Sequence, residues 1–179
     1  MKPEGIKAGR FPFGQIPAYE DDEVSGLVQM GAILRHIGRR FEAYGDGNVE
    51  AAQVDMVLDA VEDTRRSYGT LVYTDRLDAA KLAEFAAKIE AGFLTQVEAF
   101  MADRSGSEGK FLATKARPSI ADYVALDMLQ LIVRILPEAL KEHTGLSTWV
   151  AGMEARAGIK AYLESKPECR ETPNGVSLG

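Results

Sequence analysis

The most apolar stretch of the sequence is PSIADYVALDMLQLIVRI, which occupies residues 118–135. Apolar side chains fall on nearly every side of the helix that this stretch predicts, so the helix should lie inside a helical domain. Ser119 and Asp122 form the pattern of a capping box, in which the serine oxygen accepts a backbone N–H and the carboxylate reaches back. We therefore assign both residues a structural role at the start of a buried helix.

Helical periodicity also marks the segments on either side of this stretch. We expect further helices from residue 30 to about residue 44 and over residues 48–74, 77–101, 147–157 and 159–165. In the helix over 77–101, apolar residues recur every three or four positions. They are Leu82, Phe85, Ile89, Phe93, Val97 and Phe100. Most of the chain is therefore predicted to be helical.

The first 28 residues differ from the rest, because they carry three prolines and four glycines and show little helical periodicity. We expect loops and short strands here. IPAYE at residues 16–20 and GLVQ at 26–29 are compatible with strands, and the acidic turn DDE at 21–23 separates them, which predicts one β-hairpin. The fold class is thus α+β. Residues 1–44 should form a hairpin with one covering helix, and residues 48–179 an all-helical domain.

Two features of this N-terminal piece, taken together, suggest a small, anionic, peptide-like ligand. Taken singly, most proline–strand junctions are only turns, and many strand-to-helix joints bind nothing. A proline at position 17 directly precedes a strand, where a cis bond would expose the neighbouring backbone amide and carbonyl. Gln29 ends the second strand just before a helix begins, and free N–H groups together with the helix dipole favour a carboxylate or phosphate there. Such a ligand would be held edge-on.

Composition limits the function classes. The chain has 179 residues, 46% hydrophobic and 27% charged, with a net charge of −6. An acidic protein lacks the basic footprint that nucleic acid or an anionic membrane requires, so neither is expected as a partner. No apolar run is long enough to span a membrane and no signal-peptide core is visible, which favours a cytoplasmic protein.

The potential ligands and nucleophiles are few. One cysteine, Cys169, and two distant histidines, His36 and His143, form none of the usual metal-binding spacings, so we expect no metal. They also give no nucleophile–histidine pair, and no catalytic residue can be named.

Four carboxylates fall within two turns of the helix predicted over residues 48–74. Such a group could serve acid–base chemistry, but two arginines follow at positions 65 and 66, and local ion pairing on a solvated face is the simpler interpretation. The carboxylates are Asp55, Asp59, Glu62 and Asp63.

Several motifs, taken in order, resemble the glutathione transferase family, and most closely its pi class. The N-terminal ones are FGQIP at residues 13–17 and Gln29 followed by ILRHIGR at 33–39. Similar motifs continue as AQVDMV at 52–57, VED at 61–63, LVYT at 71–74, SIADY at 119–123 and IKAYL at 159–163. The resemblance implies a truncated thioredoxin-like piece that carries the glutathione site, a helical domain that lines a pocket for a hydrophobic electrophile, and a homodimer.

The resemblance also assigns roles to single residues at the glutathione site. Gln15 and Ile16 would contact glutathione, with Ile16 using its backbone beside a cis Pro17. Gln29 would hold the γ-glutamyl end. Lys7 is a match, offset by one position, to the lysine that binds the glycyl carboxylate in the family.

Further roles concern the second subunit and the electrophile. Asp63 would reach the glutathione bound in the partner subunit, and Phe13 matches the aromatic key that inserts between helices of the other subunit. Tyr73 matches a tyrosine of the hydrophobic substrate pocket. Met30 stands where the family has a serine that binds the γ-glutamyl carboxylate.

One departure from the family concerns the chemistry itself. In the family, a strand, a helix and a second strand precede this region, and the first strand bears the tyrosine that lowers the pKa of the glutathione thiol. The sequence begins in the loop that follows, so we expect this tyrosine to be absent and the thiolate, which is the nucleophile, to lack its hydroxyl donor.

We therefore expect a glutathione transferase that conjugates glutathione, its substrate, to hydrophobic electrophiles and that is impaired in this chain. The alternative is a non-catalytic dimeric binding or scaffold protein that kept the helical domain. The hairpin would leave a bare sheet edge, which predicts either a compensating rearrangement or a swapped or otherwise altered dimer.

Overall fold

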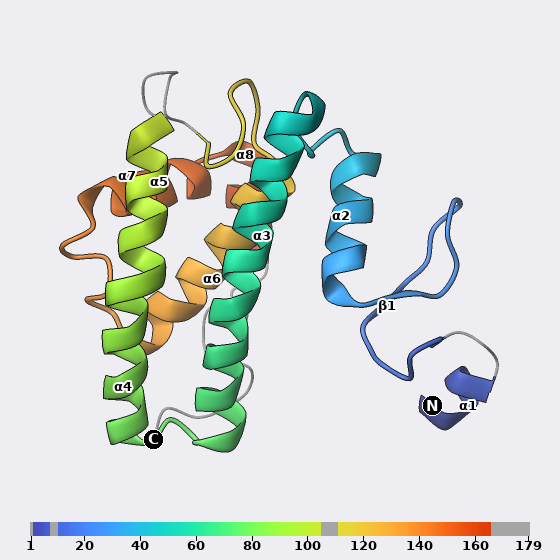
Figure 1. Ribbon diagram of the computed structural model, residues 1–179, viewed down its shortest axis with the longest axis horizontal. Coiled ribbons are helices and arrows are strands. Elements are labelled where there is room, and N and C mark those ends of the chain that lie inside the picture. The colour runs from blue at the N-terminus through green and yellow to red at the C-terminus, as the bar shows by residue number, and fades with distance from the viewer. Residues whose placement is uncertain (1, 8–10, 105–110, 166–179) are drawn as a thin grey trace.

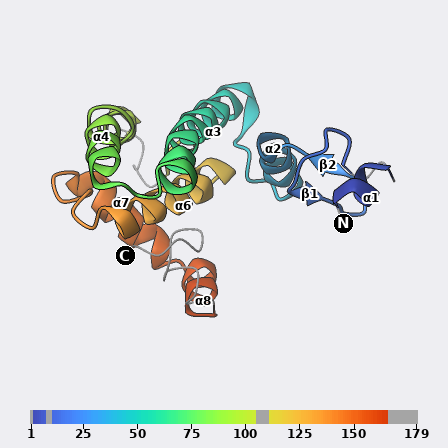
Figure 2. The same ribbon diagram turned by 90° about the horizontal axis from the view of Figure 1, so that it is seen from below.

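The computed structural model describes residues 2–7, 11–104 and 111–165, and Figure 1 shows two groups of elements in it. The first group holds α1 (Lys2–Lys7), β1 (Ala18–Tyr19), β2 (Leu27–Val28) and α2 (Met30–Arg40). The second holds α3 (Gly47–Gly69), η1 (Thr70–Thr74), α4 (Ala79–Ile89), η2 (Glu90–Leu94), α5 (Thr95–Arg104), α6 (Ile120–Ile135), α7 (Thr144–Glu154) and α8 (Ala157–Ser165). Seen from below, the first group lies beside α3, on the side away from α4 (Figure 2).

The N-terminal group contains the predicted hairpin. The two strands pair antiparallel, with Ala18 opposite Val28 and Tyr19 opposite Leu27. The expectation of loops and strands before the hairpin is wrong for α1. A proline is tolerated in the first turn of a helix, where its missing N–H would have no partner, and the acidic Glu4 in the same turn is favoured by the helix dipole.

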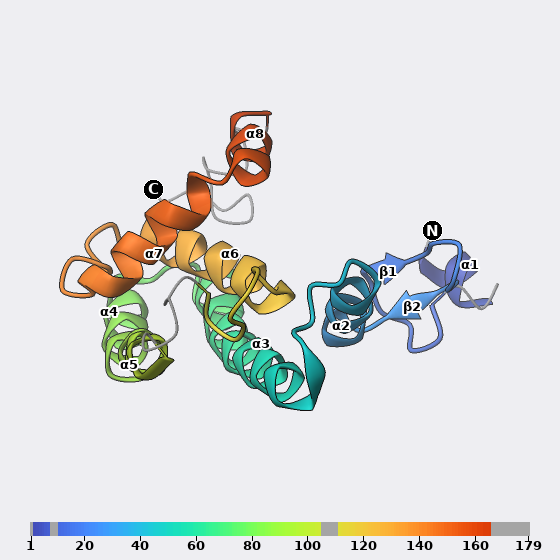
Figure 3. The ribbon, with the colours of Figure 1, turned by 90° about the horizontal axis from the view of Figure 1, so that it is seen from above.

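Helix α6 lies inside the helical group, as its sequence predicts. It lies behind and between α3 and the continuous helix of α4 and α5 in Figure 1, and beside α3 in the view from above in Figure 3. Eleven of its 16 residues are buried, from Ile120 to Ile135. The other core residues come from α3, α4, α5 and α7, from the turns η1 and η2, and from Leu112 and Ala113 before α6.

The capping box at the start of α6 is present and fully buried. The Asp122 carboxylate accepts hydrogen bonds from the Ser119 backbone N–H and hydroxyl, each at 2.8 Å, and from the Leu112 N–H at 2.8 Å. Burial raises the pKa of Asp122, and the three hydrogen bonds oppose that rise. These contacts form the capping box that the sequence pattern of Ser119 and Asp122 predicts.

Both long helices predicted over residues 48–74 and 77–101 contain a widened π-helical turn. Helix α3 continues directly into η1, and η2 joins α4 to α5 without a break. In the second helix, the buried Phe85, Ile89, Phe93 and Val97 are each four residues apart. Four residues exceed one α-helical turn, so a turn with more residues keeps such a series on one face.

Helix α7 begins three residues before its predicted start. The Glu98 carboxylate of α5 accepts the N–H groups of Gly145 at 2.8 Å and Leu146 at 3.3 Å, and so supplies the cap from another helix. Local sequence carries no signal for this contact.

The predicted division of the chain near residue 44 stays a prediction. Leu34 and Ile37 of α2 and Tyr44 pack against the same core as the helical group. Within the described residues, no helix has the length and apolar character that crossing a membrane would need.

Candidate functional site

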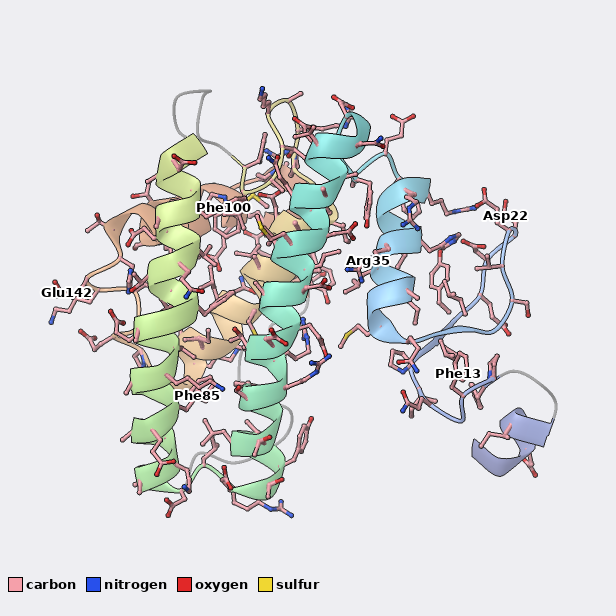
Figure 4. The ribbon with its side chains drawn as sticks, in the orientation of Figure 1. Phe13, Asp22, Arg35, Phe85, Phe100 and Glu142 are labelled. Atoms are coloured by element: carbon pink, nitrogen blue, oxygen red, sulfur yellow. The ribbon has the colours of Figure 1, made fainter. Side chains whose placement is uncertain are left out.

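A cleft of about 420 Å³ opens between the start of α2 and the outer side of α3. Figure 4 shows Arg35 extending from α2 into the space between these two helices. The N-terminal segments contribute Gln15, Ile16, Pro17, Gln29, Met30, Gly31, Ala32, Leu34 and Arg35 to the lining, and the helical group contributes Leu58, Asp59, Val61, Glu62, Arg65, Arg66 and Val124. Four of the residues expected at a glutathione site, Gln15, Ile16, Gln29 and Met30, therefore lie together.

Backbone geometry shapes the N-terminal wall of the cleft. The peptide bond between Ile16 and Pro17 is cis, as the sequence suggested. Gln29 has φ 72° and ψ 111°, a conformation with positive φ that few residues other than glycine adopt. Its carbonyl accepts the first hydrogen bond of α2, from Ile33 N–H at 3.0 Å, while the Gln29 side chain makes no capping hydrogen bond. The first N–H groups of α2 are thus left for another acceptor.

Arg35 ties the two walls together. Its Nε donates to Asp55 Oδ1 at 2.5 Å and one terminal nitrogen donates to Asp59 Oδ1 at 2.7 Å, and Tyr44 also donates to Asp55. Partial burial would raise the pKa of Asp55, but the hydrogen bonds from Tyr44 and Arg35 outweigh it and hold that pKa below its usual range. The same two carboxylates raise the pKa of Arg35.

The carboxylates and arginines farther along α3 pair locally, as their spacing predicts. Arg65 lies 3.6 Å from Glu62 and 3.5 Å from Asp127, and Arg66 lies 3.4 Å from Glu62 and 3.3 Å from Asp63. Asp63 is exposed and is not among the cleft-lining residues. Asp55 and Asp59 are ion-paired too, but with Arg35 of α2, so the prediction of local pairing within α3 is wrong for these two.

The remaining predicted site residues lie elsewhere. Tyr73, at the end of η1, and Phe13 are exposed by 58% and 72%, and neither lines the cleft. Figure 4 shows Phe13 in the N-terminal segment, on the side of α2 away from α3. The side chain of Lys7 lies outside the described residues, as does Cys169.

A second charged cluster joins the hairpin turn to α2. Asp21 accepts a hydrogen bond from His36 at 2.9 Å, and Arg40 pairs with Asp21, Asp22 and Glu23. The hydrogen bond from His36 holds the pKa of Asp21 well below its usual range. Among the described residues, no three histidine, cysteine or carboxylate side chains are grouped so that they could hold a metal ion.

Comparisons with known proteins show the family to which the chain belongs. A family model described as "Glutathione S-transferase, C-terminal domain" matches residues 62–166. Glutathione S-transferase P of Bos taurus is 36% identical over 163 residues, which cover 91% of this chain and 75% of the relative. The chain belongs to the glutathione S-transferase family. The family resemblance of its motifs is thereby confirmed.

Two further comparisons bear on class and fold. Glutathione S-transferase P of Homo sapiens is 37% identical over 170 residues, covering 95% of this chain and 78% of the relative. The structure of a pi-class glutathione S-transferase from Onchocerca volvulus superposes with a TM-score of 0.83 at 27% identity, covering 96% of this chain and 80% of that one. The predicted similarity to the pi class of glutathione S-transferases and the α+β fold are both confirmed.

Proposed function

We propose that this chain binds glutathione in the cleft between α2 and α3. The observation that carries the proposal is the convergence of Gln15, Ile16, Gln29 and Met30 on one wall, at a helix start that the Gln29 side chain does not cap. The γ-glutamyl carboxylate would accept the free N–H groups of α2, where the helix dipole also favours negative charge. Gln29 would hold the α-amino end, and the backbone of Ile16 beside Pro17 would hold the cysteinyl peptide.

The roles of the residues outside the cleft are part of the same proposal. Exposed Asp63 would reach the glutathione bound in a partner subunit, and exposed Phe13 would insert into that subunit in a homodimer. Tyr73 would line the pocket for the hydrophobic electrophile, and Lys7 would contact the glycyl carboxylate. We place the protein in the cytoplasm.

The reaction would be conjugation of glutathione to hydrophobic electrophiles, with impaired chemistry in this chain. The reactive species is the thiolate, and a hydroxyl donor stabilises it. None of the described residues that line the cleft carries a hydroxyl group. The guanidinium groups of Arg35 and Arg65 are already paired with carboxylates, which weakens their effect on a thiolate. The same observation favours the alternative, a non-catalytic dimeric binding protein.

A calorimetric titration with glutathione tests the binding site. We expect saturable binding, and Gln29→Asn should weaken it about tenfold, because a lost hydrogen bond costs about 1.4 kcal/mol. Asparagine tolerates positive φ, so the backbone should be kept. Gln96→Asn, the same change at an exposed position of α5, is the control and should bind like the wild type. Equal affinity for both variants would refute the assignment of Gln29.

An activity assay separates the two functions. With saturating glutathione and chlorodinitrobenzene as electrophile, an impaired transferase conjugates faster than the uncatalysed reaction, and Gln29→Asn slows it. A non-catalytic binding protein binds glutathione with no rate above the uncatalysed one.

A further inference from the structure

The connector between α2 and α3, residues 41–46, is bound by the loop that precedes α6. In Figure 1 this connector joins the upper ends of α2 and α3. The backbone N–H of Ile120, the first residue of α6, donates to the Ala43 carbonyl at 2.7 Å. Arg117 Nε donates to the neighbouring carbonyl, that of Glu42, at 2.9 Å. One loop of the helical group thus holds two consecutive carbonyls of the connector.

Helix α2 ends in a tight turn centred on Glu42. The Glu42 N–H donates to the Arg39 carbonyl at 3.3 Å and the Ala43 N–H to the Gly38 carbonyl at 2.7 Å, which is the Schellman pattern of a helix end. This pattern favours glycine at the position of Glu42, because the residue there has a positive φ, here 54°. The bond from Arg117 to the Glu42 carbonyl holds this disfavoured turn in place.

Gly38 lies where α2 packs tightly against the first residue of α6. A Cβ added at Gly38 would lie 2.9 Å from Ile120 Cγ2 and 2.8 Å from Tyr44 Cδ2, closer than side chains approach in folded proteins. Gly38 is also buried. The contact between α2 and α6 therefore has no room for even one methyl group.

The loop on the other side of this contact is itself held in place. Thr114 is buried, and its hydroxyl donates to the Arg117 carbonyl at 2.6 Å. Asp122 of the capping box accepts the Leu112 N–H at 2.8 Å. A terminal nitrogen of Arg117 donates to Asp46 Oδ1 at 2.8 Å, at the far end of the connector. The loop is therefore a fixed support for α2.

We propose that the loop before α6 positions α2, and through it the wall of the cleft, with Arg117 and Gly38 as positioning residues. This inference rests on the proposed glutathione site. Helix α2 has 11 residues, so its anchored end lies about 15 Å from Met30 at the cleft. A tilt at the anchored end would shift Gln29 and Met30 relative to α3. Neither Arg117 nor Gly38 lines the cleft, so each acts on binding through α2.

Exchange of backbone amide hydrogens tests the position of α2 without any ligand. In the full chain, Gly38→Ala should speed deuterium uptake across residues 30–40 about tenfold and leave uptake in α6 unchanged. Alanine is the better helix former, so faster exchange would not come from helix propensity. Gly92→Ala, in η2, is the matched control, because an added Cβ there meets no atom within 4 Å. It should exchange like the wild type.

A second pair of variants tests Arg117 through calorimetry with glutathione. Arg117→Met removes both bonds to the connector and should weaken binding about fivefold, the effect of about one lost hydrogen bond. Arg156→Met, the same change at an exposed position between α7 and α8, is the control and should bind like the wild type. Arg117 and Asp46 pair at the surface, with side chains 47% and 63% exposed, so both variants should unfold in urea nearly like the wild type.

The possible outcomes separate this proposal from the proposed function. Uptake in Gly38→Ala that rises equally in α2 and α6, or that does not rise in α2, would overturn the positioning of α2 by α6. Wild-type affinity in Arg117→Met would overturn the role of Arg117. A wild type that binds no glutathione would refute the proposed function, while the exchange measurement would still decide whether the loop before α6 positions α2.

Discussion

Arg35 is the side chain that holds α2 against α3, through one carboxylate near the start of α3 and another a turn later. Its own side chain is 26% exposed, and the Asp55 side chain 42%, so that pair is a partly shielded, charge-assisted contact. Asp59 is 73% exposed, so its pair with Arg35 lies at the surface and contributes less. Because the cleft lies between these two helices, Arg35 also sets the width of the candidate site. Replacing Arg35 should therefore weaken ligand binding in the cleft in addition to breaking its own contacts with Asp55 and Asp59.

Replacing Arg35 tests this link at the residue scale. We expect Arg35→Gln to lower the free energy of unfolding by about 1–2 kcal/mol, since two charge-assisted hydrogen bonds are lost. Arg66→Gln, the same change at a side chain that is 72% exposed, should cost less than about 0.5 kcal/mol. Urea denaturation measures both. Similar costs for the two variants would contradict a special role for Arg35.

Asp122 allows a second prediction at this scale. Asp122→Asn keeps the shape but puts an NH₂ group where the carboxylate accepts three hydrogen bonds. We expect a loss of about 1–3 kcal/mol, because a buried donor is left without its acceptor. Ser119→Ala, which removes only the hydroxyl, should cost about 0.5–2 kcal/mol. Chemical denaturation decides whether the carboxylate or the hydroxyl matters more.

The site could be predicted from sequence only where neighbouring residues carry the signal. The cis Ile16–Pro17 bond, Gln29 at a helix start and the capping box of α6 were all visible as local patterns. The pairing of Arg35 with Asp55 and Asp59 joins positions about 20 residues apart, and only the packing of α2 on α3 brings them together. Spacing within α3 therefore indicated a solvated face.

At the scale of elements, α7 depends on α5 for its start. Glu98 accepts two N–H groups of α7 and a hydrogen bond from His143 Nδ1 at 2.7 Å, while His143 Nε2 lies 3.0 Å from Glu90 of η2. Burial alone would lower the pKa of His143, but the bonds to Glu98 and Glu90 outweigh it and raise that pKa. Burial would raise the pKa of Glu98, and the bonds from His143, Leu146 and Gly145 lower it instead.

The contribution of these contacts between α5, η2 and the start of α7 to the free energy of unfolding should depend on pH. A raised histidine pKa in the folded state stabilises the fold fully below the ordinary value of 6.5, and this stabilisation is lost as the pH rises through the folded value. A lowered Glu98 pKa contributes above its ordinary value of 4.5 and is lost as the pH falls through the folded value. The His143 and Glu98 contacts should thus stabilise the fold most between pH 4.5 and 6.5.

Two variants distinguish the contribution of the charged pair His143–Glu98 from that of the Glu98 cap on α7. We expect His143→Gln to flatten the fall in unfolding free energy above pH 6.5. Glu98→Gln should flatten it too while keeping α7 capped, because the amide oxygen still accepts the N–H groups of Gly145 and Leu146. Urea titrations across this range measure the slope. An unchanged slope in both variants would assign the pH dependence to other groups.

At the scale of the whole molecule, assembly is the main prediction. Phe13 exposes 72% of its surface, as the proposed insertion into a partner subunit requires. We expect the wild type to sediment as a dimer and Phe13→Ser to shift the equilibrium toward monomer. Tyr162→Ser, in α8 and also exposed, is the control. A wild-type monomer would refute the proposed homodimer, and an unaffected dimer would refute the role of Phe13.

The positions of the main helices and of the hairpin could be predicted better than the ends of single elements. Apolar periodicity located α2 to α6, and turn residues located the hairpin, because each pattern reflects burial on one face. The short α1 has no apolar stripe, and the earlier start of α7 depends on Glu98 of another helix. A helix end that a tertiary contact fixes, such as the start of α7, therefore could not be predicted from the sequence.

The widened turn η2 behaves as one residue inserted into an otherwise regular helix. Phe85 and Val97, on either side of it, are twelve positions apart and both buried. At about 100° per residue, eleven positions bring two side chains back to within about 20°, whereas twelve leave them about 120° apart. Deletion of the exposed Ala91 should therefore convert the turn to α-helix without rotating either half. Natural variation in chain length by a single residue would be tolerated at this point.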